Sequence, residues 1–431
     1  MKIVTAADYK VEIKRRNEQS IDLEFDRKVL SIINDVRMNG DAALHMYTER
    51  FDGVKLENFI VADDEFDEAY TLVSENFIAS LQKAKRRITD FHEEQKERSW
   101  FIRQEKGILL GQQVTPIERV GIYVPGGKAA YPSTVLMNAI PAKIAGVGYI
   151  TIATPPQSDG KVNPHVLVAA KETGVDVVYK VGGAQAIAAL AYGTETIRKV
   201  MKVTGPGNAY VARAKKWVFG DVGIDMIAGP SEICVLADET SDPAYVAADL
   251  LSQAEHDEQA AAICVTTSEQ FAGKLIAEVE ERLPKLDRME IASRSINDFG
   301  RIIVVDSLTE AIEVVNEIAP EHLQVMVENP VEQLPFIRNA GAIFLGAYSP
   351  EALGDYMAGP NHTLPTSGTA AFSSPLGVYD FLKKSSIIQY TEEAFEEVAD
   401  DIIILAEAER LTGHAESIRL RKGERNEKRE N

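Results

Sequence analysis

The order of hydrophobic and polar positions divides the chain into a helical first part and an alternating remainder. Apolar residues recur at helical spacing at Val29, Ile33 and Val36, and residues 20–110 as a whole are charged and helical in pattern. From about Glu118 onwards, short runs rich in β-branched residues alternate with Gly/Ala-rich helical stretches. The strands predicted there are 120–124, 149–153, 177–181, 200–203 and 233–236, with helices at 135–145, 165–173, 184–191 and 209–218.

A second alternating set follows, and it ends in a long loop. The predicted strands are 261–266, 302–305, 324–327 and 342–345, with helices at 242–255, 271–283 and 309–318. Strand–helix alternation over this length predicts βαβ units and a parallel sheet, hence an α/β fold. Residues 346–378 interrupt it with a Gly/Pro/Ser/Thr-rich stretch, which is typical of a functional or disordered loop. A last helix is expected at 393–413, followed by an exposed charged end at 419–431.

Composition narrows the function classes. The 431 residues carry a net charge of −20, which argues against a protein whose main task is binding nucleic acid or an anionic membrane. A chain of this length is expected to form more than one domain. The first ten residues are too charged for a secretory signal, and no apolar run reaches the ~18 residues of a membrane span. Cys234 and Cys264 lie in apolar runs and predict buried strand thiols, so a cytoplasmic protein is expected.

Seven histidines are the most informative polar residues. Three of them have ordinary helical surroundings and are expected to be solvated or to cap helices: His45, His92 and His165. The other four lie in distinctive clusters: His256, His322, His362 and His414.

Two clusters pair a histidine with another polar residue close in sequence. Gln253 and His256 are three residues apart and share a helix face, which suits a zinc site, although a charged helix end with a capping histidine accounts for the pair alone. Glu321 and His322 follow Pro320 just before a predicted strand, so their side chains point in different directions and can divide proton transfer. An ordinary surface position explains that pair equally well.

The other two clusters lie in the long loop and near the chain end. Asp355 and His362 are held among Gly and Pro residues, and loops carry functional sites more often than other segments. Glu409 and His414 flank a helix end, where a histidine is also common as a C-terminal cation. Together the four clusters suit a divalent metal with mixed nitrogen and oxygen ligands. Their separation in sequence leaves open whether they meet.

Three glycine-rich turns follow predicted strands, at 123–127, 182–183 and 204–208. The turns at 182–183 and 204–208 join a strand to a helix, and either can offer backbone N–H groups to a phosphate at a helix start. None is the G-x-G-x-x-G dinucleotide fingerprint or a P-loop, so plain strand-to-helix turns remain an alternative.

Several of these strings together resemble the histidinol dehydrogenase family. They are Asp249–Asp257, Ala319–Leu323, Gly354–Pro365, Val124–Gly127, Thr204–Asn208, Ala228–Glu232 and Glu409–His414. The likeness extends from about residue 20 to 415 with the family's order and comparable spacing. It implies a zinc-dependent, NAD-linked four-electron oxidation of L-histidinol through L-histidinal to L-histidine, using two NAD, as the last step of histidine biosynthesis.

The resemblance also implies roles for individual residues. The zinc ligands would be Gln253, His256, Asp355 and His414, with the substrate's imidazole and amine completing the coordination. His322 would take the alcohol proton, and Glu321 would help water attack the aldehyde. Substrate contacts would come from Ser231, Gln253, His256, His322, Asp355, Glu409 and His414, and NAD contacts from Tyr123, Gln185 and Asn208. Glu409 and His414 would act in the site of the partner subunit of a homodimer.

The implied architecture is α/β, with two degenerate, doubly wound Rossmann-like domains and a small segment from both chain ends, as in aldehyde dehydrogenases. The expected boundaries are 20–123 with 236–375 for the first domain, 124–235 for the second, 1–19 with 376–400 for the small domain, and 401–431 for a helical tail reaching the partner.

The sequence leaves three other functions open. A zinc hydrolase of amides or esters could use the same ligands, with Glu321 activating water, and would not depend on NAD. A non-catalytic acidic scaffold would show neither metal nor turnover. A relative could oxidise another imidazole or amino alcohol.

Overall fold

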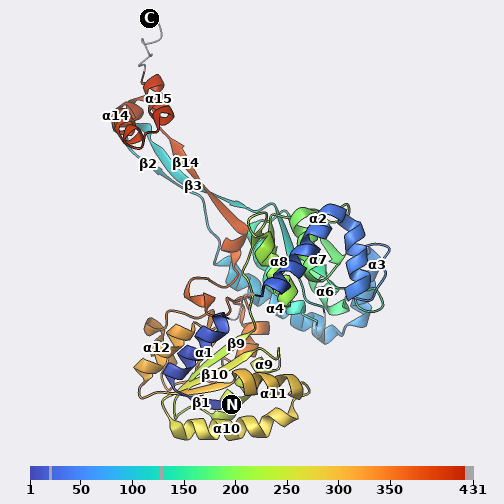
Figure 1. Ribbon diagram of the computed structural model, residues 1–431. Helices are drawn as coiled ribbons and strands as arrows, with labels where there is room; N and C mark the ends of the chain where they lie inside the picture. The colour runs from blue at the N-terminus through green and yellow to red at the C-terminus, as the bar shows by residue number, and fades with distance from the viewer. Residues whose placement is uncertain (19–21, 127–129, 423–431) are drawn as a thin grey trace, which may run out of the picture. The chain divides into compact units, whose positions relative to one another are not determined.

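The computed structural model describes residues 1–18, 22–126 and 130–422. It confirms the α/β class, because the two larger sheets are built of parallel strand pairs (Figure 1). The last residue of the predicted turn at 123–127 and most of the charged end at 419–431 lie outside the described residues. In the part of the chain that is described, no helix is both long enough and apolar enough to cross a membrane.

A five-stranded parallel sheet is formed by the first alternating part of the chain. Its strands are β4 (Arg119–Tyr123), β5 (Tyr149–Thr154), β6 (Val177–Lys180), β7 (Lys202–Thr204) and β8 (Gly223–Ile224). Their spatial order is β6-β5-β4-β7-β8. The chain therefore adds strands on one side of β4 first and then on the other. The carboxyl ends of β4 and β7 flank this reversal, which is where open α/β sheets bind ligands.

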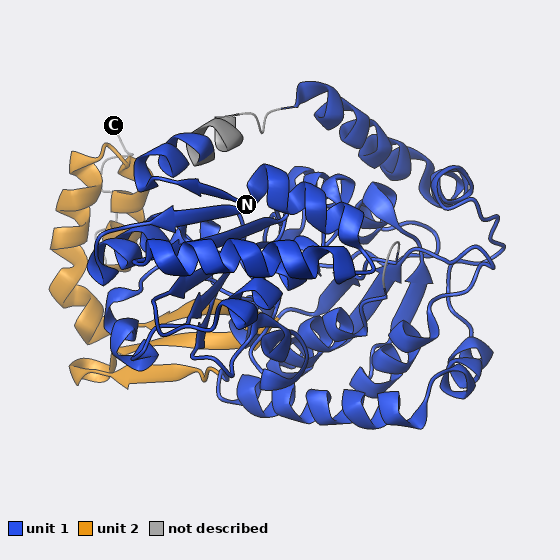
Figure 2. Ribbon diagram, turned by 90° about the horizontal axis from the view of Figure 1, so that it is seen from below, with its two compact units in different colours: residues 1–96, 117–381 blue, residues 97–116, 382–431 orange. Residues whose placement is uncertain are grey.

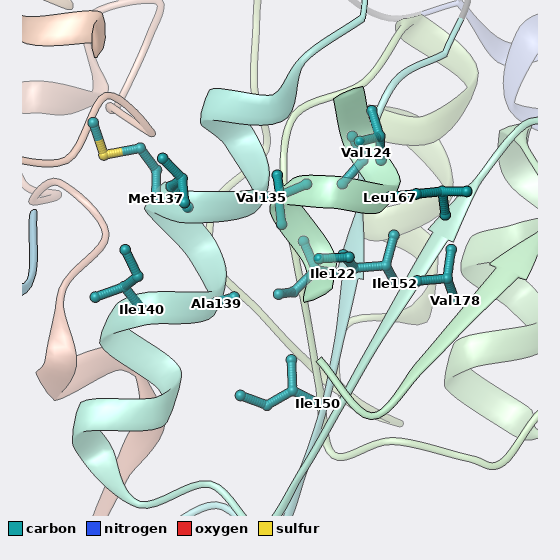
Figure 3. Close-up of a cluster of buried hydrophobic side chains, with 14 of the residues drawn as sticks. Ile122, Val124, Val135, Met137, Ala139, Ile140, Ile150, Ile152, Leu167 and Val178 are labelled. Carbon is teal, nitrogen blue, oxygen red and sulfur yellow. The ribbon is translucent and has the colours of Figure 1, made fainter. Parts of the chain in front are cut away.

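Apolar helices cover this sheet and produce its core. They are α5 (Pro132–Ala145), α6 (Pro164–Thr173), α7 (Gly183–Tyr192) and α8 (Ala209–Val218), together with the N-terminal α2 (Leu23–Phe51), α3 (Asp63–Leu72) and α4 (Glu75–Glu93). Figure 3 shows how Val135 and Ala139 of α5 face the strand residues Ile122 and Ile150. Ile122 and Ile150 are fully buried, which explains why these strands read as continuous apolar runs.

A six-stranded parallel sheet contains the second alternating part. Its order is β1 (Lys2–Val4), β11 (Arg301–Val304), β10 (Ala261–Thr266), β9 (Glu232–Ala237), β12 (His322–Val325) and β13 (Ala342–Leu345). Helices α1 (Ala6–Glu18), α9 (Pro243–Ala254), α10 (Glu269–Arg282), α11 (Met289–Phe299) and α12 (Leu308–Ile318) accompany it. Cys234 and Cys264 lie in β9 and β10 and are fully buried, as predicted. The first residues of the chain form one edge of this sheet, paired with β11.

Contacts divide the chain into two units, coloured in Figure 2: residues 1–96 with 117–381, and residues 97–116 with 382–431. The second unit contains an antiparallel sheet of β2 (Trp100–Arg103), β3 (Leu109–Pro116) and β14 (Leu382–Gln389), with helices α14 (Glu392–Ala408) and α15 (Thr412–Arg421). The domain boundaries expected from the sequence stay a prediction.

Three local expectations were wrong. The segment 100–110 forms strand β2 and the start of β3 instead of helix, because β3 pairs with β14, more than 250 residues later in the chain. The last helix is interrupted: α14 ends at Ala408, Arg410 has a φ of 59°, and α15 follows. His92 is fully buried instead of solvated, because α4 packs against α5 and the long loop.

Candidate active site

The pairing of β9 with β12 brings Glu321 and His322 against the backbone of Glu232. His322 lies opposite Ile233 in the parallel register. The N–H of Glu232 donates to Glu321 Oε2 at 2.9 Å, and the C=O of Glu232 lies 3.0 Å from His322 Nδ1. Because a carbonyl only accepts, Nδ1 carries the proton and Nε2 is left as the acceptor. His322 Nε2 is buried and has no hydrogen-bond partner in the described structure.

Burial controls the charge of this pair. Desolvation lowers the pKa of His322 to about 4, so its imidazole is neutral near pH 7. Desolvation also raises the pKa of Glu321 well above its usual value, while the hydrogen bond from the Glu232 N–H opposes that rise. His322 Nδ1 lies 3.7 Å from Glu321 Oε2, which is too long for a hydrogen bond. Each group can therefore act on a different proton.

Gln253 lies in the last turn of α9, and His256 lies two residues beyond the end of that helix, so the two do not share a helix face as the sequence suggested. Gln253 is fully buried, whereas His256 is exposed. In the orientation of the Gln253 amide that suits its neighbours, its nitrogen donates to Glu351 Oε1 at 3.0 Å and Oε2 at 3.2 Å and lies 3.2 Å from His322 Nδ1. Its oxygen lies 2.8 Å from His256 Nδ1. Glu351 therefore turns the amide oxygen of Gln253 toward His256.

The long loop contributes acidic groups to the same place. Glu351 lies in the short helix α13 (Glu351–Leu353), with Oε1 3.9 Å from His322 Nε2. Asp355 follows it in the helical turn Gly354–Ala358, with Oδ1 3.7 Å from His362 Nδ1. One potential ligand atom from each of His322, Glu351 and Asp355 lies within 4.8 Å of the other two. Imidazole and carboxylate donors gathered in this way fit a divalent metal, and of these three residues only Asp355 belongs to the predicted zinc set.

A buried polar network fixes the part of the loop that carries His362. Asn361 Nδ2 donates to the C=O of Met137 in α5 at 2.5 Å and lies 3.4 Å from Nε2 of His92 in α4. His92 Nδ1 lies 2.8 Å from the C=O of Ile88. Helices α4 and α5 therefore hold a segment that has no regular secondary structure of its own.

The residues predicted to contact NAD lie at the carboxyl end of the five-stranded sheet. Tyr123 ends β4 and is buried, and its hydroxyl accepts the N–H of Gly183 at 3.0 Å. Gln185 is buried in the first turn of α7. Asn208 is exposed and caps α8, accepting from the N–H of Tyr210 and of Val211. The Tyr123 hydroxyl thus joins the end of β4 to the turn before α7.

The structure brings most predicted site residues together within the first unit. Gln253 and His322 both neighbour Glu351, and Ser231 directly precedes β9, half-buried. Glu409 and His414 belong to the second unit, where both are exposed. The sequence interpretation missed Glu232 and Glu351. A charged residue at the start of an apolar strand is the available signal for Glu232, and an acid inside the long loop is the signal for Glu351.

Comparisons with known proteins point to one family, and each of the following matches covers nearly the whole chain. The family model described as histidinol dehydrogenase matches residues 14–422. The chain is 55% identical over 422 residues to histidinol dehydrogenase from Oceanobacillus iheyensis, which covers 98% of this chain and 99% of that relative. It is 53% identical over 421 residues to histidinol dehydrogenase from Bacillus subtilis, covering 98% of each. A crystal structure of histidinol dehydrogenase from Elizabethkingia anophelis superposes with a TM-score of 0.89 at 42% identity, covering 94% of this chain and 93% of that one.

Proposed function

We propose, because the chain belongs to the histidinol dehydrogenase family, that it performs a zinc-dependent, NAD-linked four-electron oxidation. Family membership makes it an oxidoreductase that converts histidinol to histidine in histidine biosynthesis. The zinc, the NAD and the residue roles are the parts that we propose. The resemblance found in the sequence is confirmed.

The observation that carries the proposal is the state of His322. Its Nδ1 proton is engaged by the Glu232 carbonyl, and its buried Nε2 has no partner in the described structure. A neutral imidazole with an open Nε2 accepts the hydroxyl proton of L-histidinol as the carbon loses a hydride. NAD+, when bound, supplies the hydride acceptor for this step and for the next. The first step therefore yields L-histidinal, NADH and a protonated His322.

Glu321 takes part in the second oxidation. A water molecule adds to the aldehyde carbon, and the Glu321 carboxylate accepts one of its protons, giving the singly ionised hydrate, which loses the second hydride to form the carboxylic acid. Burial makes the carboxylate a stronger base because it raises the Glu321 pKa, and the Glu232 N–H stabilises the ionised form. The products are L-histidine and a second NADH.

Gln253, His256 and Asp355 would hold zinc from within one subunit. Zinc, when bound, supplies a fixed positive charge that orients the imidazole and amine of L-histidinol. Glu351 supports this set by holding the Gln253 amide, although its carboxylate is not among the ligands that we propose. His414 would complete the set from the partner subunit. It is exposed on the second unit, as a ligand for another subunit must be.

The second unit also carries the surface that favours a homodimer. Large apolar side chains are exposed on its strands and helices: Trp100, Phe101, Ile102, Ile388, Ile404 and Leu405. Such a concentration on a small unit is typical of a protein–protein interface. We propose that a second copy of the chain covers it, and that the enzyme works in the cytoplasm.

The direct test is NADH formation, followed by absorbance, with L-histidinol and NAD+ before and after treatment with a zinc chelator. We expect turnover that the chelator abolishes and that added zinc restores, with two NADH formed for each L-histidinol consumed. One NADH per substrate would overturn the four-electron reaction. Turnover of amides or esters without NAD+ would favour the hydrolase instead.

A further inference from the structure

A buried ion pair lies directly beneath the turn that follows β7, and the proposed reaction does not use it. Lys215 of α8 and Asp225, which follows β8, form an ion pair whose side chains are 2% and 1% exposed. Lys215 Nζ also donates to the C=O of Gly205 at 2.8 Å, and the N–H of Gly205 donates to Asp225 Oδ2 at 2.8 Å. Lys215 and Asp225 thus form hydrogen bonds with the C=O and the N–H of the same turn residue, Gly205.

The positions of the two charges follow from the local fold. Side chains in a helix lean toward its N-terminus, so the long Lys215 side chain reaches back from α8 to the turn that precedes it. Strand β8 pairs with β7 in parallel, and both therefore end at the same edge of the sheet. Asp225 thus comes beside Gly205 and also accepts the N–H of Met226 at 2.6 Å.

Gly205 itself is pressed against the neighbouring strand. Its φ is +105°, and a Cβ there would lie 2.1 Å from the backbone oxygen of Tyr123. Two residues that we propose contact NAD, Tyr123 and Asn208, are therefore linked through this glycine. Any rotation of the Gly205 peptides would change how Asn208 and the start of α8 are presented.

Stability alone is a weak reason for such a pair. Removing two charges from water is costly, and an apolar pair of similar size generally serves folding as well or better. What an apolar pair lacks is the ability to hold a backbone N–H and a C=O at once. The Lys215–Asp225 pair does both, on the inner side of a turn whose Asn208 is exposed.

We infer that Lys215 and Asp225 are positioning residues that fix the Gly205–Asn208 turn in the conformation that binds NAD. This inference rests on the proposed function, because it takes this turn as the NAD contact. Neither residue would touch the reacting atoms. Their loss should weaken NAD binding and leave the metal and L-histidinol sites, which lie on the other sheet, unchanged.

The test compares NAD+ affinity in three variants of the full-length, zinc-loaded enzyme, measured by titration calorimetry. The double variant Lys215→Met with Asp225→Asn removes both charges and the bond to the Gly205 carbonyl. Asn208→Ala removes the proposed contact itself. Lys202→Met with Asp380→Asn is the matched control, because that pair is also largely buried but lies at the start of β7, away from the turn.

We expect the double variant at 215 and 225 to bind NAD+ about tenfold more weakly, with zinc content and L-histidinol affinity as in the wild type. The control pair should bind NAD+ as the wild type does. If Asn208→Ala weakens NAD+ binding while the double variant keeps wild-type affinity, the positioning role is wrong and the proposed NAD site stands. If Asn208→Ala binds NAD+ normally, the proposed site itself is wrong.

A variant that fails to fold does not end the test. Asp225→Asn alone keeps an acceptor for the Gly205 N–H and a polar partner for Lys215, so it perturbs folding less. We expect this variant to raise the KM for NAD+ about threefold or more with little change in kcat at saturating NAD+. An unchanged KM in a folded Asp225→Asn enzyme would overturn the inference.

Discussion

At the scale of single residues, the candidate site depends on atoms that the fold leaves without partners. The backbone of Glu232 forms a hydrogen bond with each of the two acid–base candidates: its N–H donates to Glu321, and its C=O accepts from His322. That arrangement chooses the tautomer of the imidazole and directs its basic nitrogen into the site. The hydrogen bonds of a strand backbone thus support the different roles that we propose for these two side chains.

His256 is one of the residues that we propose as zinc ligands. His256→Ala should release zinc, because it removes an exposed imidazole next to the only amide ligand in the proposed set. Elemental analysis of the purified protein should find less than about a tenth of the wild-type zinc, in line with the loss of one ligand. His165→Ala, which removes a histidine packed on Phe77, is the control and should keep its zinc. Full zinc in the His256 variant would contradict the ligand assignment.

The division of labour between Glu321 and His322 gives a second prediction. Glu321→Gln should slow oxidation of L-histidinal more than oxidation of L-histidinol to the aldehyde, by about 100-fold or more, because only the second step needs a base for water. The two half-reactions can be followed separately by supplying each substrate in single-turnover experiments. Equal losses in both would show that Glu321 serves no distinct step.

The buried imidazole also predicts a pH dependence of stability. Between pH 6.5 and about 4 the unfolded chain binds a proton at His322 that the folded chain does not, because burial lowers the folded pKa to about 4. Stability therefore falls as the pH falls through this window, by about 3 kcal/mol in total from this residue. Urea unfolding of zinc-free wild type and His322→Asn should show a shallower pH slope for the variant. Parallel slopes would refute the lowered pKa.

Local sequence found most of these residues but not all. Gln253, His256, Glu321 and His322 stand in short strings that the sequence offered as candidates, and the family resemblance assigned their roles. Glu351 belongs to the long loop, and its importance arises only when that loop folds back toward α9 and β12. Contacts between residues 98 positions apart, as for Gln253 and Glu351, or 29 apart, as for His322 and Glu351, leave no periodic signal in a single sequence.

At the scale of elements, the predictions were most accurate for helices and strands whose formation depends on nearby residues rather than on a distant partner strand. Most of the parallel strands and their helices were predicted within a few residues, because the central strands are buried on both faces and their apolar runs are continuous. The short edge strands β1 and β8 and the helices α1 and α11 were not predicted. Strands β2 and β3 were missed because their partnership with β14 is distant and because β2 is exposed on both faces. The apolar run of β2, Trp100–Ile102, is only three residues long and does not alternate with polar residues, so it gives no strand signal by itself.

Asn361 connects the long loop to Met137 and His92, so we expect its replacement to lower both the free energy of unfolding and the affinity for zinc. Asn361→Ala removes hydrogen bonds to Met137 and Thr363, and it should lower the free energy of unfolding by about 2 kcal/mol. Because the same segment carries His362 and follows Asp355, zinc affinity should fall as well. Asn39→Ala, which removes an exposed bond to Asp35, is the control and should change neither. Unfolding curves and zinc titrations would show the two losses together or refute their link.

At the scale of the whole molecule, the proposed site requires two chains. Glu409 and His414 belong to a unit that is separate from the one that holds the acid–base pair. The resemblance, not the residue spacing, assigned them to the partner's site, because no pattern in one chain reports on a second copy. The exposed apolar residues of the second unit are the structural support for that proposal.

Subunit mixing checks this arrangement. His322→Ala and His414→Ala should each be inactive as homodimers, because each lacks one essential group in every site. Mixed dimers should regain activity, up to about half per dimer, since one of the two sites then receives both native residues. A tagged subunit would verify exchange, and mixing either variant with itself is the control. No recovery after verified exchange would place the whole site within one chain.

The edge position of β1 has a consequence for how the protein is made. Residues 2–4 are synthesised well before their partner strand Arg301–Val304, so this edge stays unpaired until that strand has been made. The five-stranded sheet needs only residues 119–224 and can form long before that. During synthesis the five-stranded sheet, whose strand ends carry the proposed NAD contacts, can therefore form first. The six-stranded sheet, which carries His322, is completed later because it needs both β1 and the strands β9 to β13.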